Sequence, residues 1–275
     1  MKNRLVSVGA AGEMTMANPH GSWIWYELMT PDPAASKAFY DAVIGWDIEA
    51  QPSAPGDIEY RMIAAHDGFV GGVLTLTPAM LAQGAKAGWL GYVGVDNVDA
   101  TVAQLETSGG TVHLPPHDLE GVGRIVMVSD PQGGHFYVMR GASDEDSHAF
   151  GRMNIGHVSW NELQTGEDAA AAFAFYNGLF GWEKAGGMPM PWGEYAFLRG
   201  RGEEEVWGAM MPREKPDQPV GWTYYFRVSD IEAAFERVKA AGGRPLHNPM
   251  EVPGGERVFA AVDPQGASFG LVAPK

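Results

Sequence analysis

The chain contains no cysteine among its 275 residues. This absence excludes disulfide bonds, thiolate metal sites, iron–sulfur clusters and a cysteine nucleophile. A chain without thiols fits a reducing compartment, so we expect a cytoplasmic protein.

Two further absences exclude classes of partner. No apolar run approaches the roughly 18 residues that suggest a membrane-spanning helix, so we expect no membrane partner. Basic residues are scarce, because 19 Lys and Arg stand against 34 Asp and Glu for a formal net charge of -15, and no basic run occurs. Phosphate binding needs clustered positive charge, so we also expect no nucleic-acid partner.

Internal repetition is what the chain does have. The stretch "SWIWYELMTPDPAASKAFYDAVIGW" at 22–46 resembles "HVSWNELQTGEDAAAAFAFYNGLFGW" at 157–182. Further along, residues 91–112 match 224–245 at an offset of 133 that holds to an Asp-Pro-Gln-Gly sequence in each copy. A repeat of this length is too long for a solenoid and predicts two homologous domains.

The boundaries follow from composition. We place the first domain at 21–141 and the second at 155–275, with a polar and acidic linker at 142–154. Residues 1–20 are expected to form a flexible leader. Two early basic residues and a short apolar stretch leave a secretory signal open as an alternative for this leader.

Local patterns alternate in the same order in each half. Aromatic "WIWYEL" predicts a strand, and Asp32-Pro33 predicts the start of a helix that ends at Gly45. Ser229 to Glu232 reads as a capping box for a later helix. Each half is therefore expected to contain two βαβββ modules, an α+β architecture.

These motifs resemble the vicinal oxygen chelate superfamily, which includes glyoxalases, bleomycin resistance proteins and extradiol dioxygenases. The resemblance lies in the helix from Asp32 to Trp46, the segment from Val95 to Ala100 and the Asp-Pro-Gln-Gly turns. It implies that each domain is a glyoxalase-like curved open sheet, a cup, flanked by helices. It also implies metal ligands on the first, fifth and last strands of each cup.

The residues at those ligand positions do not favour a metal. A divalent cation needs imidazole or carboxylate groups that converge on it. The positions are Trp25, Leu90 and Tyr137 in the first domain and Trp160, Thr223 and Gly270 in the second. We therefore predict no metal site and no cofactor. His113 and His117, in a Pro-rich segment, are expected to be exposed loop residues, with a metal site there as the alternative.

Side chains two positions apart share one face of a strand, which predicts what lines each cup. In the first cup we expect Trp23, Trp25, Glu27, Tyr92, His135 and Tyr137. In the second we expect Trp160, Glu162, Thr223, Tyr225 and Arg227. Glu27, Glu162, His135 and Tyr137 are the candidate catalytic groups, because a carboxyl in an aromatic pocket can act as a general acid or base. The others are candidate ligand-binding residues.

Aromatic walls with few polar groups suit a planar or apolar molecule. The sequence thus predicts a metal-independent glyoxalase-like protein that binds a small aromatic or hydrophobic molecule. The alternative is a superfamily enzyme, a lyase, isomerase or ring-modifying enzyme, that uses the cup carboxyls with His or Tyr or holds an unrecognised metal. In the structural alternative, the tryptophans fill the cups and the glutamates pair with Arg124, Arg227 or Arg257. A homodimer stays open.

Overall fold

The computed structural model describes residues 18–53, 58–143 and 145–275. The first domain contains β1 (Trp23–Thr30), α1 (Pro33–Ile44), β2 (Asp47–Ile48), β3 (Tyr60–Ala65), β4 (Gly68–Thr75), α2 (Pro78–Ala82), β5 (Gly88–Gly94), α3 (Val98–Thr107), β6 (Thr111–Leu119), β7 (Gly123–Ser129) and β8 (His135–Gly141). The second contains β9 (Val158–Thr165), α4 (Ala169–Phe180), β10 (Glu183–Met190), β11 (Gly193–Arg199), β12 (Val206–Pro212), β13 (Gly221–Arg227), α5 (Ile231–Ala240), β14 (Arg244–Pro245), β15 (Met250–Glu251), β16 (Arg257–Val262) and β17 (Ser268–Ala273). The predicted α+β architecture is confirmed.

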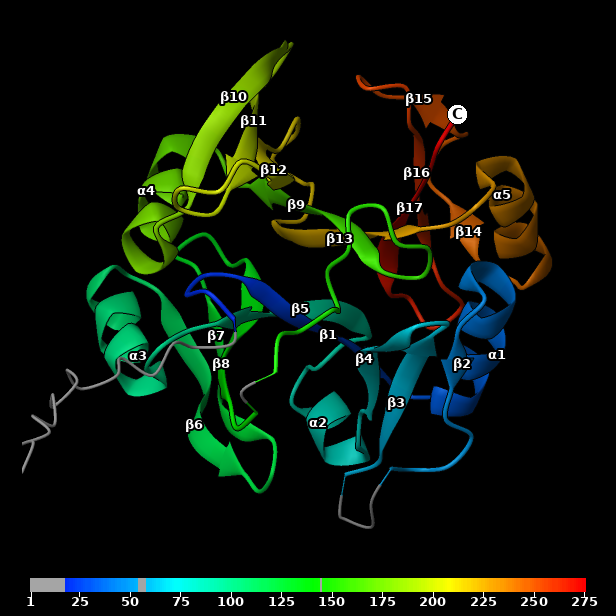
Figure 1. Cartoon of the computed structure of the whole chain (residues 1–275), viewed down its shortest axis with the longest axis horizontal. Coiled ribbons are helices and arrows are strands. Elements are labelled where there is room, and N and C mark those ends of the chain that lie inside the picture. Colours follow the sequence, from blue (N-terminus) through cyan, green and yellow to red (C-terminus); the bar gives the residue numbers. More distant parts are fainter. Residues whose placement is uncertain (1–17, 54–57, 144) are drawn as a thin grey trace, which may run out of the picture.

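Each domain has one mixed sheet, and the two sheets have the same topology. The strand order is β2-β3-β4-β1-β5-β8-β7-β6 in the first and β10-β11-β12-β9-β13-β17-β16-β14 in the second, where β15 also pairs with β16. The central strands of each sheet run antiparallel to each other, and each has a parallel neighbour on its outer side. Figure 1 shows that both sheets curve and that their open sides point away from each other.

The helix ends follow the local sequence. The Asp32 carboxylate accepts a hydrogen bond from the Ala35 amide at the start of α1, and Gly45 ends that helix in a left-handed conformation with φ 91°. The capping box predicted from Ser229 is wrong by one residue, because Asp230 is the N-cap of α5. The Asp230 carboxylate accepts from two first-turn amides, which leaves no capping role for Ser229.

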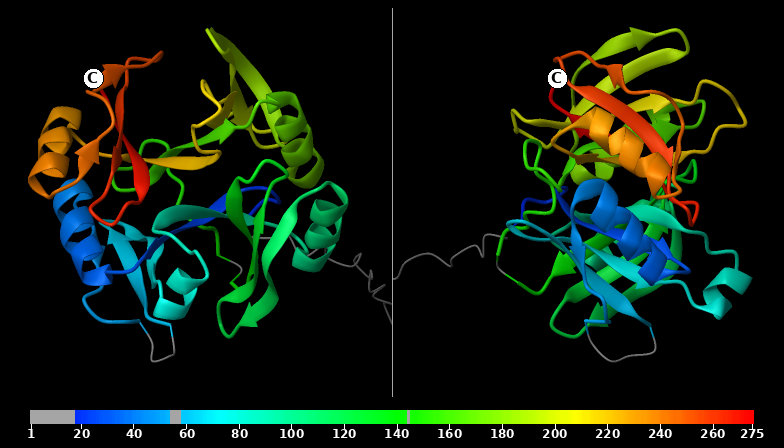
Figure 2. Two further views of the ribbon diagram at one scale, coloured as in Figure 1. Left: turned by 180° about the vertical axis from the view of Figure 1, so that it is seen from behind. Right: turned by 90° about the vertical axis from the view of Figure 1, so that its right-hand side faces the viewer.

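The backs of the two sheets face each other and form one shared core. Buried residues of both domains belong to a single hydrophobic cluster. The Tyr26 hydroxyl on β1 donates to Asn161 Oδ1 on β9 at 2.9 Å, and the Gly91 amide on β5 donates to the Tyr224 hydroxyl on β13 at 2.7 Å. The view from behind in Figure 2 shows the central strands of the two sheets next to each other at the middle of the molecule. The cups therefore lie on the outer faces.

The helices also join the domains. Figure 1 shows α1 beside α5 and α3 beside α4. Tyr40 on α1 donates its hydroxyl proton to Asp263 Oδ2 at 3.0 Å, and Tyr176 on α4 donates to Asp130 Oδ2 at 2.8 Å. The two acceptors are the aspartates of the Asp-Pro-Gln-Gly turns. Each turn thus receives a helix tyrosine from the other domain.

No helix within the described residues is long and apolar enough to cross a membrane. Residues 1–17 of the predicted leader lie outside the described part of the chain. The segment predicted as a linker lies between β8 and β9. Its Phe150 forms an isolated parallel β-bridge with Val158, the first residue of β9.

Candidate functional site

Four aromatic side chains surround Glu27 on the outer face of the first sheet. Trp25 Nε1 donates to the Tyr60 hydroxyl at 2.9 Å, and the Tyr92 hydroxyl donates to Glu27 Oε2 at 2.8 Å. The ring of Tyr137 stacks on that of Tyr92, with centroids 4.3 Å apart and planes inclined by 15°. Strand register explains the grouping, because Trp25 lies opposite Tyr92 and Tyr92 opposite Tyr137. We call this set the first cup.

The second sheet repeats the arrangement around Glu162. Trp160 Nε1 donates to the Tyr195 hydroxyl at 2.9 Å, and that hydroxyl donates to Glu162 Oε2 at 2.6 Å. The Tyr225 hydroxyl donates to Glu162 Oε1 at 3.2 Å. We call this set the second cup. A Trp–Tyr–Glu–Tyr arrangement is therefore present twice in the chain.

The two cups differ in exposure, and residue 270 explains the difference. Glu27, Tyr92 and Tyr137 are buried, whereas Glu162 and Tyr225 are partly exposed. The tryptophan and the third-strand tyrosine are partly exposed in both cups. Where the first cup has Tyr137, the second has Gly270. A Cβ added to Gly270 would lie 2.2 Å from the Tyr225 ring, so this ring leans over the glycine. The first cup is filled by its own tyrosines, and the second lacks one ring.

Burial dominates the electrostatics of both carboxyls. It raises the pKa of Glu27 to about 7, although the hydroxyls of Tyr92, Tyr137 and Tyr60 act to lower that pKa. Burial also raises the pKa of Glu162, against the hydroxyls of its two tyrosines and the charge of His247. Both carboxyls are thus shifted toward the neutral acid.

The predicted place of Trp23 in the first cup is wrong. The pairing of β1 with β5 shifts register between Trp23 and Trp25, and such a bulge breaks the alternation of faces. Trp23 therefore points into the shared core, where its ring centroid lies 4.9 Å from that of Trp222. Gly91 allows this approach, because a Cβ there would lie 2.4 Å from the indole.

His135 lies exposed at the start of β8. Its ring centroid is 4.6 Å from that of His113, which hydrogen-bonds Ser129 Oγ through Nε2 at 2.9 Å. Burial, and next the charge of His135, lower the pKa of His113. His113 and His117 belong to β6, an edge strand that accommodates the two prolines between them, and not to a loop as expected.

Thr223 and Arg227 share the cup face of β13 with Tyr225. Thr223 lies directly opposite Glu162 and is partly exposed. Arg227 is buried, and its Nη1 donates to Glu256 Oε1 at 2.6 Å, which balances its charge. Arg227 therefore does not pair with Glu162.

The other arginines of the structural alternative also have partners of their own. Arg124 pairs with Asp99 and Asp118, and Arg257 pairs with Glu232. The cup glutamates are held by tyrosine hydroxyls instead.

The sequence interpretation missed Tyr60 and Tyr195. Both come from the third strand of their domains, far along the chain from the glutamates that they approach. A signal was present, because Glu-Tyr occurs at 59–60 and 194–195 with the same spacing of 135 that separates Trp25 from Trp160 and Glu27 from Glu162.

The donor groups of the cups do not fit a divalent metal. Each cup offers one carboxylate, two or three phenols and an indole N–H, which can only donate a hydrogen bond. Within residues 18–53, 58–143 and 145–275, no group of three or more His, Cys, Asp or Glu side chains could hold a metal ion.

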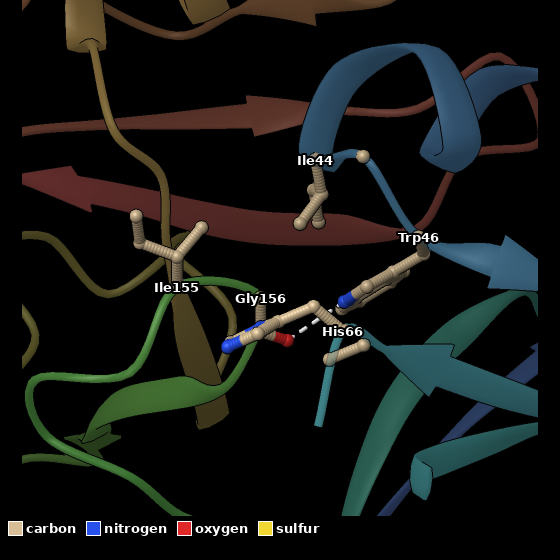
Figure 3. Close-up of a pocket in the computed structure, with 7 residues that line it drawn as sticks. Ile44, Trp46, His66, Ile155 and Gly156 are labelled. Carbon is tan, nitrogen blue, oxygen red and sulfur yellow. Dashed lines mark hydrogen bonds between the residues drawn. The ribbon is translucent and has the colours of Figure 1, made fainter. Parts of the chain in front are cut away.

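A separate cavity of about 240 Å³ lies between the domains (Figure 3). Its lining comes from the end of α1, the end of β3 and the segment before β9, and includes Ile44, Trp46, His66 and Ile155. Trp46 Nε1 donates to the Gly156 carbonyl at 2.7 Å. His66 is its one titratable group, so this cavity offers little polar chemistry to orient a ligand.

Comparison with known proteins gives consistent matches over both domains. The model of the Glyoxalase/Bleomycin resistance protein/Dioxygenase superfamily matches residues 23–136 and 154–271. CFP32 of Mycobacterium bovis, named as a glyoxylase, is 31% identical over 252 residues, which cover 91% of this chain and 94% of that protein. DnrV of Streptomyces peucetius, named as an anthracycline biosynthesis protein, is 31% identical over 268 residues, covering 92% and 93%.

Two solved structures share the fold. The Mn(II)-bound glyoxalase from Novosphingobium aromaticivorans superposes with a TM-score of 0.63 at 18% identity, over 92% of this chain and 82% of that one. Homoprotocatechuate 2,3-dioxygenase from Brevibacterium fuscum, in complex with 3,4-dihydroxyphenylacetate, gives 0.64 at 15% identity, over 96% and 84%. Identities this low show likeness of fold alone.

Proposed function

Because the chain belongs to the Glyoxalase/Bleomycin resistance protein/Dioxygenase superfamily, we propose that it is a metal-independent member that binds a small aromatic or hydrophobic molecule in its aromatic-lined cups. The observation that carries this proposal is the Trp–Tyr–Glu–Tyr arrangement, present twice and accessible around Glu162. Aromatic walls bind planar molecules by area and stacking, and one carboxyl can orient them.

Two observations support the ligand class and the absence of a metal. Relatives named for anthracycline biosynthesis cover nearly the whole chain, and anthracyclines are fused-ring aromatic compounds. One oxygen of Glu27 already accepts from a tyrosine hydroxyl at 2.8 Å, and both oxygens of Glu162 do so at 2.6 and 3.2 Å. Phenols and an indole are poor ligands for the cations that this fold usually binds.

Calorimetric titration with anthraquinone-2-sulfonate, a soluble planar probe, tests the binding. We expect saturable binding that falls by at least about tenfold in Trp160→Leu, since the substitution removes one wall of the second cup. Phe69→Leu is the control, because Phe69 is 55% exposed and belongs to the first domain, not to the second sheet that carries Trp160. Equal loss in both variants, or no binding by the unmodified protein, contradicts the proposal.

The metal claim has its own test. Elemental analysis of the purified protein should find far less than one divalent metal per chain, and binding should survive dialysis against a chelator. One metal per chain, with binding lost on chelation and restored by that metal, would show that the protein depends on a metal.

A second candidate function is acid–base catalysis, which one observation favours. Glu27 has a pKa raised to about 7, and its buried Oε1 has no hydrogen-bond partner within the described part of the chain. A carboxyl that changes protonation near neutral pH suits a lyase or isomerase. In this reading Glu27 or Glu162 transfers the proton, with Tyr137 or His135 assisting in the first cup. Turnover of a bound compound that disappears in Glu27→Gln or Glu162→Gln, while binding persists, would identify the enzyme.

A further inference from the structure

The two cups provide a comparison within one molecule. In the first, the Tyr137 phenol stacks on Tyr92 at 4.3 Å and its hydroxyl faces Glu27. The side chain occupies the cup as a ligand would, with its ring against an aromatic wall and a polar group directed at the carboxyl. Glu27 is 2% exposed as a result.

The second cup keeps each of these partners except the phenol. Tyr225 corresponds to Tyr92 and reaches Glu162 Oε1 at 3.2 Å, and Trp160 and Tyr195 repeat the bonds of Trp25 and Tyr60. Gly270 stands in the place of Tyr137 and contributes no ring. Glu162 accordingly keeps accessible surface at the floor of the cup.

We propose that the second cup binds a phenol, an aromatic molecule with a ring hydroxyl, which takes the part that Tyr137 plays in the first cup. The ring lies against Tyr225, and the hydroxyl donates a hydrogen bond to the Glu162 carboxyl. This inference rests on the proposed binding function and specifies its ligand class.

The surrounding charges favour a hydroxyl over a carboxylate on the ligand. Arg152 lies over the Trp160 ring, with its guanidinium carbon 5.1 Å from the centroid. Arg152 and Arg227 both contact Glu256, at 3.8 and 2.6 Å, so a carboxylate of this chain already balances them. His247 accepts a hydrogen bond from the Ala260 amide through Nε2. A ligand carboxylate would therefore meet the acceptor oxygens of Glu162, while the two nearby arginines are already paired with Glu256.

Three ligands with the same naphthalene ring test the class by calorimetric titration. We expect 2-naphthol to bind with one site per chain, and at least about tenfold more tightly than 2-methoxynaphthalene, which cannot donate a hydrogen bond, or 2-naphthoate. Gly270→Tyr should weaken 2-naphthol binding by at least about tenfold, because a side chain there collides with the Tyr225 ring, which lies 2.2 Å from a Cβ at this position, and crowds the cup.

Tyr137→Gly supplies the complementary test and does not depend on whether Gly270→Tyr folds. Removal of the Tyr137 ring should open the first cup beside Glu27 and Tyr92, so the number of 2-naphthol sites should rise from one to two. A stoichiometry that stays at one in folded Tyr137→Gly, verified by circular dichroism, overturns the inference.

The remaining outcomes separate this inference from the proposed function. If the three ligands bind equally and Trp160→Leu weakens all of them, the cup binds aromatics but has no phenol preference, and only the inference fails. If none binds, and anthraquinone-2-sulfonate does not bind either, both proposals fail.

Discussion

Glu27 is a carboxyl group enclosed by aromatic side chains, and its environment decides its protonation. It is 2% exposed, and one oxygen accepts a hydrogen bond from Tyr92 while the other has no partner among the residues that the structure describes. Burial of an ionised carboxylate with an unpaired oxygen costs much free energy, whereas burial of the neutral acid costs much less. The local chemistry therefore favours a neutral acid at a pH where exposed glutamates are charged.

The pH dependence of stability tests this at the level of one residue. The pKa of Glu27 rises from 4.5 to about 7 on folding, so between these values the folded protein keeps a proton that the unfolded chain releases. The free energy of unfolding should fall as the pH rises from 4.5 to 7, by on the order of 3 kcal/mol from this residue. Glu27→Gln cannot ionise, so its urea unfolding measured from pH 4.5 to 8 should show a flatter dependence.

Glu106→Gln is the control for that experiment, since Glu106 is an exposed residue of α3. It should keep the pH dependence of the unmodified protein. If Glu27→Gln keeps the full dependence as well, then Glu27 does not titrate in this range and the acid–base candidate loses its support.

At this scale the sequence predicted part of the site. Trp25 with Glu27, and Trp160 with Glu162, could be paired because side chains two apart on a strand share a face. Tyr60 and Tyr195 could not, since their approach depends on how the third strand is placed in the sheet. Trp23 was predicted on the wrong face because a bulge changes the alternation and leaves no mark in the residue pattern.

The elements that hold the cups in place are the helices and the Asp-Pro-Gln-Gly turns. In each turn, two backbone amides of the loop donate hydrogen bonds to Oδ1 of the aspartate, which is Asp130 in the first domain and Asp263 in the second. Its second oxygen accepts from the tyrosine of a helix in the other domain. The turn thus closes the last hairpin of one domain and anchors a helix of the other.

Removal of the Tyr40 hydroxyl tests this anchoring. That hydroxyl donates to Asp263 Oδ2 and accepts from Trp89 Nε1 at 2.9 Å, so Tyr40→Phe leaves two buried groups without partners. We expect a loss of about 2 kcal/mol in the free energy of unfolding by urea. Tyr176→Phe should give a similar loss, because Tyr176 repeats the contacts with Asp130 and Trp222.

Thr107→Val is the control, because it removes an exposed hydroxyl that bonds only the Ala103 carbonyl of its own helix. Its effect should stay within about 0.5 kcal/mol. Equal effects of Thr107→Val and Tyr40→Phe would contradict an anchoring role for the turn.

Element boundaries were the most predictable feature of the chain. Asp32, Pro33 and Gly45 are local signals, and α1 begins and ends where they indicate. The partner of α1 was not predictable in the same way. The bonds of Tyr40 and Tyr176 to the opposite turns depend on how the two sheets meet.

At the scale of the whole molecule, the two domains share one aromatic core. Trp23 of the first domain lies among Trp182, Trp207 and Trp222 of the second, with centroids 5.6, 6.0 and 4.9 Å away. Neither sheet can keep the back of its central strands covered without the other. The duplication predicted from the sequence therefore produced two cups on opposite faces of a single folded unit.

This shared core predicts cooperative unfolding of the whole chain. The unmodified protein should unfold in urea in one transition, with coincident curves by circular dichroism and tryptophan fluorescence. Trp23→Ala should lower the free energy of unfolding by about 3–5 kcal/mol without splitting that transition, because the cavity it leaves borders both domains. Trp192→Ala, in the turn between β10 and β11 and partly exposed, should cost less than about 1 kcal/mol. Two resolved transitions in the unmodified protein would instead mean that each domain is stable alone.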